Sequence, residues 1–280
     1  MILRNLRNTR RLFSIARILA QEDALFLIDD LEISPVISII CRVFTTKRPG
    51  KRKGECLATA IERLGPTFIK LGQAVSTRSD LVGEDIAKDL AGLRDNLVPF
   101  PSSIARKIIE DEFKQKIELL FPEFNNLPVA AASIAQVHQA MTRDGKKVAV
   151  KILRPDIEKA FARDLEFFFW IAEIIEKHIQ GWRRLKPVQV VQTFRETVFF
   201  ELDLRFEAAA ASEMAENIKH HEAGLLVPDI DWNRTSRRVL TMSFVEGIPF
   251  SDIEAIKNSG FDVDMILSKA ARSLVAQVFK

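Results

Sequence analysis

The spacing of apolar residues divides the chain into a helical first part and a mixed remainder. Up to about residue 125, apolar positions recur every three to four residues, the period of an amphipathic helix. Helix-breaking residues, notably Pro35 and Gly65-Pro66, interrupt this pattern. Residues 45–54 form a basic segment with Pro and Gly that is typical of a linker. The predicted helices cover most of residues 1–44, then 56–64, 67–77, 85–93 and 102–113.

The pattern changes after Pro128. Two apolar runs, residues 137–141 and 148–153, flank Asp144-Gly145, which predicts a β-hairpin. In the second run the period is two, so Ala149 and Lys151 face one side. Further on, the pattern predicts helices over 156–180 and 188–219, a strand over 237–244 and a helix over 253–280. This order indicates an α+β fold.

Composition narrows the class of protein. Of 280 residues, 47% are hydrophobic and 28% are charged, which excludes a disordered tail, a collagen-like fibre and a multi-span membrane protein. A net charge of +3 is too small to indicate nucleic-acid binding. The two cysteines, Cys41 and Cys56, cannot form a disulfide scaffold and favour a reduced, cytosolic setting.

The N-terminus interleaves arginines with apolar residues. No stretch reaches the ~18 apolar residues that a transmembrane helix needs. Two interpretations stay open: a basic amphipathic helix lying on an anionic membrane surface, or a soluble helix with a solvated arginine face. The residues involved are Arg4, Arg7, Arg10, Arg11 and Arg17, with Leu3, Leu6, Leu12, Phe13 and Ile15.

Lys151 is the first candidate for chemistry. A small residue beside a lysine on one strand face, here Ala149, can admit a flat base while the ammonium reaches a phosphate. An ordinary exposed lysine is the alternative. Before the hairpin, residues 129–137 (VAAASIAQV) are rich in alanine, so either a helix or a phosphate-binding loop of small side chains fits them.

Two further groups of polar residues stand in predicted helices. Asp203 and Glu207 are four residues apart and share a face, an arrangement that needs a nearby cation such as Lys151. An i,i+4 salt bridge between Glu201 and Arg205 is the simpler interpretation. Lys70 and Gln73 also share a helix face, beside a weakening Gly72. No zinc-ligand spacing and no Walker A, G-x-S-x-G or H-E-x-x-H sequence occurs.

The order of these segments resembles the UbiB family of atypical protein-kinase-like proteins, which is tied to ubiquinone biosynthesis. The resemblance covers residues 10–280. It rests on Lys70-Leu71-Gly72-Gln73 (the family's KxGQ), VAAASIAQVH, VAVKILRPDI around Lys151, Glu201-Leu202-Asp203 (its ExD) with Glu207, and SFVEGIPF at the hinge.

The resemblance implies a protein-kinase-like N-lobe with an N-terminal helical KxGQ extension and a truncated C-lobe. The implied divisions are 1–125 for the extension, 126–247 for the N-lobe with inserted helices and 248–280 for the start of the C-lobe. It implies that Lys151 contacts the phosphates of ATP, that Glu207 is its αC-like partner, and that Glu246 is the hinge acid near the adenine. The implied nucleotide loop consists of Val129, Ala130, Ala131, Ala132, Ser133, Ile134, Ala135, Gln136 and Val137.

The same resemblance implies that Lys70 and Gln73 lie over the nucleotide site and face Glu201 and Asp203, as a regulatory group. Because this extension obstructs protein substrates in the family, ATPase or small-molecule kinase activity is expected rather than protein phosphorylation. The implied cofactors are ATP and Mg²⁺. The implied partners are a membrane surface and proteins or lipid intermediates of ubiquinone biosynthesis, at the cytoplasmic side of the inner membrane.

One departure from the family is large. No catalytic-loop H-x-D…N and no D-F-G string occurs in these 280 residues, so metal ligands are expected beyond residue 280 and no catalytic or metal-binding residue is assigned. The chain alone is expected to be catalytically inactive, as a fragment, a split gene product or a pseudogene product. The alternatives are a non-catalytic, membrane-associated scaffold or regulatory module, and an inactive truncated product.

Overall fold

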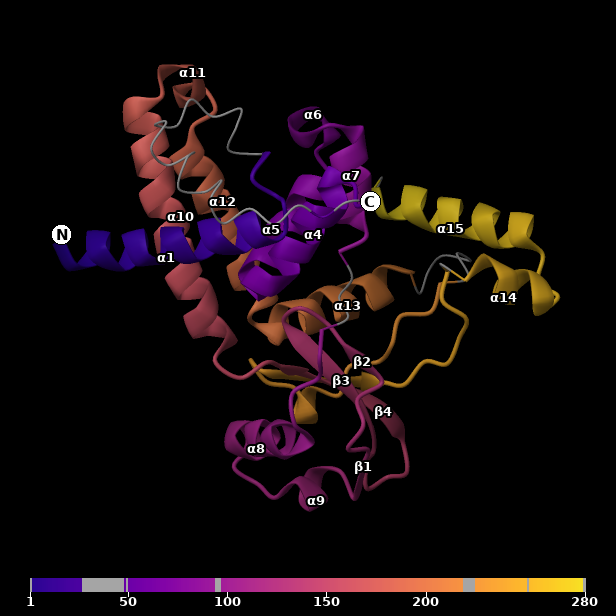
Figure 1. Cartoon of the computed structure of the whole chain (residues 1–280). Coiled ribbons are helices and arrows are strands. Elements are labelled where there is room, and N and C mark those ends of the chain that lie inside the picture. The colour runs from indigo at the N-terminus through magenta and orange to yellow at the C-terminus, as the bar shows by residue number, and fades with distance from the viewer. Residues whose placement is uncertain are drawn as a thin grey trace. The chain divides into compact units, whose positions relative to one another are not determined.

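A computed structural model describes residues 2–26, 48, 50–93, 97–218, 225–250 and 252–278. The chain forms two compact units (Figure 1). The first contains residues 1–98, 131–135 and 154–199, and the second contains residues 99–130, 136–153 and 200–280. The segment 27–47, which includes Cys41 and part of the predicted first helix, lies outside the described residues. The three divisions expected from the resemblance stay a prediction.

The first unit is built from helices. Gly65, at a φ of +105°, ends one helix, and Pro66 begins the next at a position where its missing N–H costs nothing. The core lies between α1, α4, α5, α7 and α10 and includes Ile61, Ile69 and Phe167. The helices are α1 (Ile2–Gln21), α4 (Lys53–Leu64), α5 (Pro66–Ser76), α6 (Ser79–Val82), α7 (Glu84–Ala91), α10 (Ile157–His178), α11 (Gln180–Arg183) and α12 (Pro187–Glu201).

Arginines on one side of α1 pair with acids on α10. Their spacing of three and four residues places them along one edge of the helix, beside the apolar face that enters the core. These pairs therefore use some of the arginines that one interpretation of the sequence assigns to a membrane surface. They join Arg4 to Glu173, Arg7 to Glu166 and Arg11 to Asp164.

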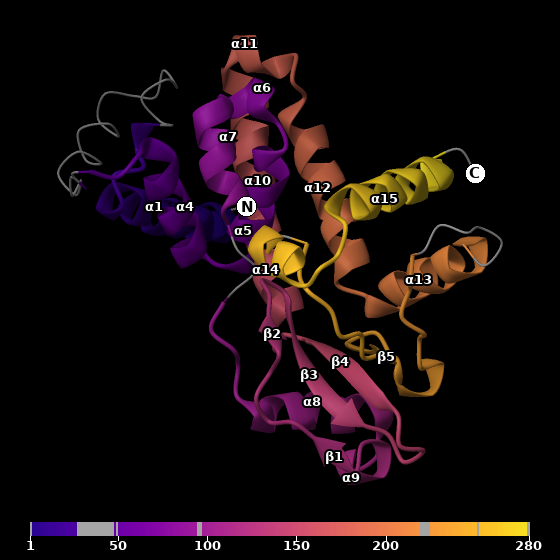
Figure 2. The ribbon, with the colours of Figure 1, turned by 90° about the vertical axis from the view of Figure 1, so that its right-hand side faces the viewer.

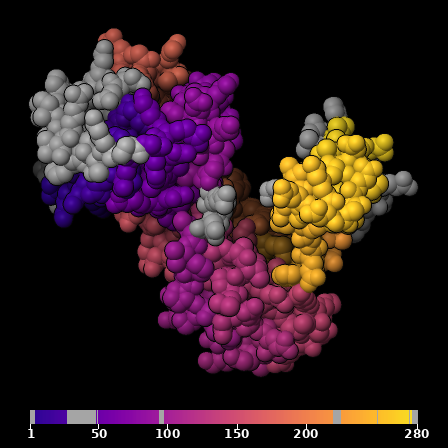
Figure 3. Space-filling model, turned by 45° about the vertical axis from the view of Figure 1, so that its right-hand side comes forward, coloured from indigo at the N-terminus to yellow at the C-terminus, as the bar shows by residue number. Residues whose placement is uncertain are grey.

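The second unit is built on an antiparallel sheet. Its strands are ordered β1-β3-β4-β5, with β2 paired to β3 (Figure 2). The helices α8 and α9 pack their apolar residues with the strands in one core, which includes Ile109, Phe121 and Val150. In the space-filling view, residues 102–153, which include α8, α9 and every strand but β5, form the magenta surface at the bottom (Figure 3). The strands are β1 (Glu123–Phe124), β2 (Ala130–Ala131), β3 (Ala135–Met141), β4 (Lys147–Leu153) and β5 (Val239–Ser243).

The predicted hairpin is confirmed. β3 and β4 are joined by a turn in which Gly145 adopts a φ of +74° and donates its N–H to the carbonyl of Thr142. Along β4, burial alternates as predicted, with Val148, Val150 and Ile152 buried. The helices of this unit are α8 (Ser102–Phe113), α9 (Ile117–Leu120), α13 (Leu204–Ile218), the 3₁₀ turn η1 (Trp232–Arg234), α14 (Ile253–Asn258) and α15 (Val263–Val278).

Two predicted helices are each broken into two, so those predictions were wrong in detail. The helix expected over 188–219 is interrupted at Leu202-Asp203, between α12 and α13. The helix expected over 253–280 is interrupted after Asn258, where Gly260 has a φ of +78° and Asp262 accepts the N–H of Asp264 at 2.9 Å. In both places an aspartate bonds to backbone two residues ahead, which competes with helical hydrogen bonding.

Candidate functional site

Lys151 and Glu207 form an ion pair in the second unit. The ammonium Nζ of Lys151, on β4, lies 2.9 Å from Oε1 and 2.8 Å from Oε2 of Glu207, in the first turn of α13. The Lys151 side chain is 23% exposed and that of Glu207 is 45% exposed. The Glu207 carboxylate holds the Lys151 ammonium in place, and both side chains are partly exposed to solvent. An anion can therefore approach the ammonium from the solvent.

The break before α13 gives Glu207 its position. Asp203 accepts the backbone N–H of Arg205 at 3.1 Å and pairs with its guanidinium at 2.9 and 2.6 Å. These bonds lower the pKa of Asp203. The single helix that was expected to carry both Glu201 and Asp203 is therefore wrong, and the i,i+4 spacing of Glu201 and Arg205 no longer applies.

The start of α13 is tied to the sheet. The N–H of Leu204 donates to the carbonyl of Arg237, at the entry to β5, at 2.9 Å. Leu204 is 1% exposed, and Ala208, next to Glu207, is fully buried. Because the helix is anchored by these contacts at its first turns, Glu207 is held at the face of the sheet that carries Lys151.

Ala149 lies on the same strand face as Lys151. In the antiparallel register, Ala149 is opposite Met242 and Lys151 is opposite Leu240. Directly opposed residues project to the same face, so these four side chains share it. The methyl group of Ala149 leaves more room there than its neighbours do.

The alanine-rich segment is a hairpin and not a helix. Val129 donates its N–H to the carbonyl of Val137, and Ala132 donates to that of Ala135, both at 2.8 Å. No residue from 129 to 137, a stretch described throughout, has a positive φ. Val129 and Ala130 are exposed, whereas residues 133–136 are buried. The helix is therefore wrong, and the binding of phosphate by this segment stays a prediction.

The segment after β5 is bound to β4. The N–H of Phe244 donates to the carbonyl of Lys147 at 3.1 Å, and the Lys147 ammonium lies 4.5 Å from the centre of the Phe244 ring. Lys147 also forms an ion pair with Glu246, which lowers the pKa of that carboxyl. Glu246 itself is largely exposed, so its carboxylate ties the segment after β5 to β4 from the solvent side, and its role as a hinge acid stays a prediction.

The KxGQ residues lie on α5 in the first unit. Lys70 and Gln73 are half-buried, and Nε2 of Gln73 lies 3.5 Å from the carbonyl oxygen of Leu93. Gly72 is buried, and a Cβ atom there would lie 2.6 Å from Cδ1 of Leu93. The ExD residues belong to the second unit, so their expected approach to Lys70 and Gln73 stays a prediction.

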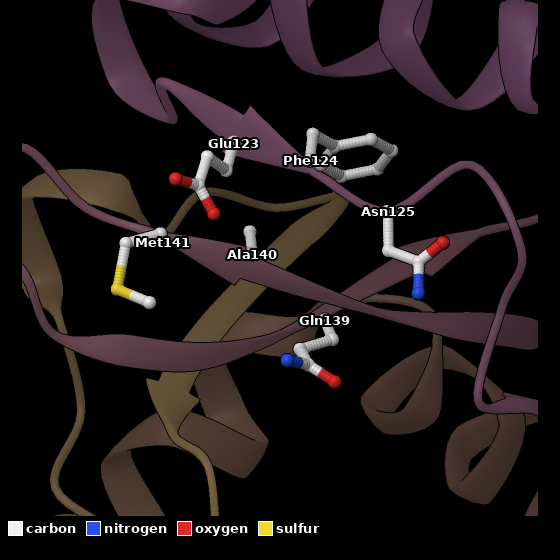
Figure 4. Close-up of a pocket in the computed structure, with 6 residues that line it drawn as sticks. All are labelled: Glu123, Phe124, Asn125, Gln139, Ala140 and Met141. Atoms are coloured by element: carbon white, nitrogen blue, oxygen red, sulfur yellow. The ribbon is translucent and has the colours of Figure 1, made fainter.

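A hollow of about 400 Å³ lies along β1 and β3, and none of the predicted site residues lines it (Figure 4). In the described part of the chain, no group of three or more His, Cys, Asp or Glu side chains is arranged to hold a metal ion. Nor does any described helix combine the length and the apolar character that crossing a bilayer requires. The hollow is lined by Glu123, Phe124, Asn125, Gln139, Ala140 and Met141.

Sequence reasoning missed Arg154. Its Nε donates to the carbonyl of Ala132 at 3.0 Å, and its NH1 donates to that of Val98 at 3.1 Å. The arginine therefore contacts the alanine-rich loop, from the residue that directly follows β4. Arg154 stands three residues after Lys151 in the sequence. That position alone does not indicate that its side chain contacts the alanine-rich loop.

Comparison with known proteins agrees with these features. Residues 92–280 match the model of the ABC1 atypical kinase-like domain. A curated protein of Marinobacter nauticus named "Probable protein kinase UbiB" is 41% identical over 83% of this chain and 42% of its own length. The protein of that name from Pseudomonas aeruginosa PAO1 is 36% identical over 97% of this chain and 52% of its own length. The chain thus spans about half the length of these relatives.

A solved structure described as the Rv3197-erythromycin complex from Mycobacterium tuberculosis is similar over 70% of this chain and 49% of that chain. Its sequence identity is 27% and its TM-score is 0.48. The family model covers more than half of the chain, including the alanine-rich loop, the Lys151–Glu207 pair and the hinge. The chain belongs to the ABC1 atypical kinase-like family, and these two relatives carry the name "Probable protein kinase UbiB".

Proposed function

We propose that this chain forms the ATP-binding part of a UbiB-type ATPase or small-molecule kinase that supports ubiquinone biosynthesis. The observation that carries the proposal is the ion pair of Lys151 with both carboxylate oxygens of Glu207. A lysine held in this way presents a fixed positive charge to phosphate, and it does so beside a hairpin of small residues.

The residues of this face fit a nucleotide. Ala149, opposite Met242, leaves space for a flat base. The proposal has the backbone of residues 244–246 bond to the edge of the base, through groups other than the N–H of Phe244, which donates to Lys147. The small side chains of residues 129–132 let the backbone approach the phosphates. In this arrangement Lys151 binds and orients the phosphates, and Glu207 keeps the ammonium in place. Bound ATP supplies the phosphoryl group, and Mg²⁺ neutralises its charge in this class of site.

The regulatory role of the extension belongs to the same proposal. The proposal assigns to Lys70 and Gln73, together with Glu201 and Asp203, the role of restricting the nucleotide site to water or a small acceptor. The resemblance assigns no Mg²⁺-binding carboxylate to these 280 residues, which span about half the length of the relatives. Nucleotide binding is therefore the property to test on these 280 residues.

Calorimetric titration of the 280-residue chain with ATP tests the proposal. Lys151→Ala is expected to weaken ATP binding by about 10–100-fold, because a charge-assisted hydrogen bond contributes about 1.5–3 kcal/mol. Lys146→Ala, on the same hairpin and with a side chain that is 76% exposed, is the matched control and leaves the affinity unchanged. Absence of ATP binding by the unmodified chain, or equal binding by both variants, would contradict the proposal.

A second proposal concerns location. Leu6 and Phe13 on α1 are 60% and 59% exposed, and Arg10 and Arg17 are exposed on the same stripe, opposite the buried face. We infer that this stripe binds an anionic membrane surface through its apolar side chains and its arginines. The proposed location is the cytoplasmic side of the inner membrane, near lipid intermediates of ubiquinone biosynthesis.

Vesicle flotation tests the second proposal. Binding is expected with vesicles that contain anionic lipid, and it should weaken as salt is raised. Arg10→Glu with Arg17→Glu should abolish it, whereas Arg183→Glu, on the exposed surface of α11, should not. Flotation of the double variant to the same extent as the unmodified chain would argue against this use of α1.

A further inference from the structure

Residues 97–100, here called the strap, run alongside the alanine-rich loop of residues 129–137. The N–H of Leu97 donates to the carbonyl of Ala131 at 3.1 Å. Further along, the backbone of Phe100 is bonded in both directions by the side chain of Gln136. The strap is also the stretch of chain at which the first unit ends and the second begins, between Val98 and Pro99.

The side-chain amide of Gln136 bonds both the N–H and the carbonyl of Phe100, as the backbone of a neighbouring β-strand would. Its Oε1 accepts the N–H of Phe100 at 3.0 Å, and its Nε2 donates to the carbonyl of Phe100 at 3.2 Å. The residue is fully buried. An amide offers a donor and an acceptor side by side, whereas an ionised carboxylate can only accept and an apolar side chain of similar size makes neither bond.

His138 fixes the orientation of that amide. Its Nδ1 lies 2.8 Å from the carbonyl oxygen of Asn125, which can only accept, so Nδ1 carries the proton. Nε2 of His138 then accepts from Nε2 of Gln136, at 2.8 Å. The imidazole is itself held by stacking on Phe124, with ring centres 4.7 Å apart. A flipped amide would place its oxygen against this acceptor, which the network excludes.

Arg154 provides a second attachment. Its Nε and NH1 bond to the carbonyls of Ala132, in the loop, and Val98, in the strap. One planar guanidinium thus bridges the two segments with its fixed donors. The loop is fastened to the strap near its tip by Arg154 and near its end by Gln136.

We propose that Gln136 and Arg154 are positioning residues that hold the alanine-rich loop in its extended form before nucleotide binds. This inference rests on the proposed function, since the loop is the expected nucleotide loop. A glycine-rich loop reaches its bound shape through positive φ angles, which alanine rarely adopts. This loop keeps negative φ angles, so its shape depends on the hydrogen bonds that it makes with the strap.

Hydrogen exchange of the 280-residue chain without nucleotide tests the attachment directly. In Gln136→Met and Arg154→Met, the amides of residues 97–100 and 129–137 are expected to exchange about tenfold faster, because one or two hydrogen bonds are lost. The matched controls are Gln139→Met, on the same strand, and Arg143→Met, in the exposed hairpin turn. They should change exchange in these segments by less than about twofold.

ATP affinity, measured on the same proteins, tests the positioning role. Both variants should bind ATP about tenfold more weakly while keeping a cooperative thermal transition. If Gln136→Met does not fold, because its position is fully buried, the test uses the ATP affinity of Arg154→Met alone. Unchanged exchange in the loop, or tighter ATP binding by either folded variant, would overturn the inference. If faster exchange occurs in a chain that binds no ATP, the attachment stands and the proposed function fails.

Discussion

Thr67 donates a hydrogen bond from its hydroxyl to the carboxylate of Asp164 at 3.0 Å, although the two residues are 97 positions apart. Both are buried, at 0% and 2% exposed. The other carboxylate oxygen of Asp164 pairs with Arg11 at 2.9 Å. This carboxylate therefore joins three helices, α1, α5 and α10. Since Thr67 lies three residues before Lys70, it also fixes the rotation of the helix that carries the KxGQ residues.

Removing the hydroxyl tests how much this bond contributes. Thr67→Val keeps the shape of the side chain but leaves Oδ2 of Asp164 with only the longer bond from Arg163, at 3.3 Å. The free energy of unfolding is expected to fall by about 1–3 kcal/mol. Urea denaturation measures it, with Thr77→Val as the control because the Thr77 hydroxyl is exposed and bonds only locally, to the carbonyl of Ala74. Equal losses in the two variants would show that the buried bond has no special role.

Gly72 is required by packing and not by backbone conformation. A Cβ atom there would lie 2.6 Å from Cδ1 of Leu93 and 3.1 Å from Cδ1 of Ile61. Gly72→Ala is expected to lower the free energy of unfolding by about 1 kcal/mol, because overpacking costs about 1–3 kcal/mol and alanine regains about 1 kcal/mol of helix propensity.

The control for Gly72→Ala is Gly181→Ala in the short helix α11. An added Cβ at Gly181 meets no atom within 4 Å, so that variant should be neutral or slightly more stable. Both variants are compared by urea denaturation. If Gly72→Ala were as stable as Gly181→Ala, Leu93 would have to move aside at no cost, and the packing explanation would be wrong.

His138 gives the protein a pH-dependent stability. Burial lowers the pKa of His138 below its ordinary value of 6.5, and the nearby Arg106 acts in the same direction. The unfolded state therefore binds a proton more readily than the folded state does. The contribution of His138 is complete above the unfolded pKa, near 6.5, and is lost as pH falls through the lower folded pKa.

Denaturation midpoints measured between about pH 7 and pH 5 test this dependence. The unmodified chain should lose stability over this range, and His138→Gln should show a smaller dependence on pH. His178→Gln, at an exposed position on α10, should keep the dependence of the unmodified chain. A parallel decline in all three proteins would assign the effect to other groups.

The sequence predicts local structure well where neighbours determine it. The alternation along residues 148–152 and the Asp144-Gly145 turn both act over a few residues, and the hairpin follows from them. The break at Leu202-Asp203 is not visible in the same way, because apolar residues continue at helical spacing across it. Only the bonds of Asp203 to Arg205 show that the helix begins again there.

The candidate site depends on contacts between distant residues, which one sequence does not reveal. The resemblance supplied the expectation that Lys151 and Glu207 lie together, because 56 residues separate them. Nothing in the sequence marked Gln136 as the partner of Phe100, or Asp164 as the partner of Thr67. Gln136, Asp164 and Thr67 are buried. A buried polar side chain needs a hydrogen-bond partner, and only the folded structure shows which residue provides it.

Chemical labelling of lysines tests the central claim most directly. The 280-residue chain is acylated with and without saturating ATP, and the extent of modification at each lysine is measured by mass spectrometry. ATP is expected to protect Lys151 several-fold, since its ammonium would contact phosphate, and to leave Lys146 on the same hairpin unprotected. Equal modification of Lys151 in the presence and absence of saturating ATP would contradict the assignment of this face as the nucleotide site.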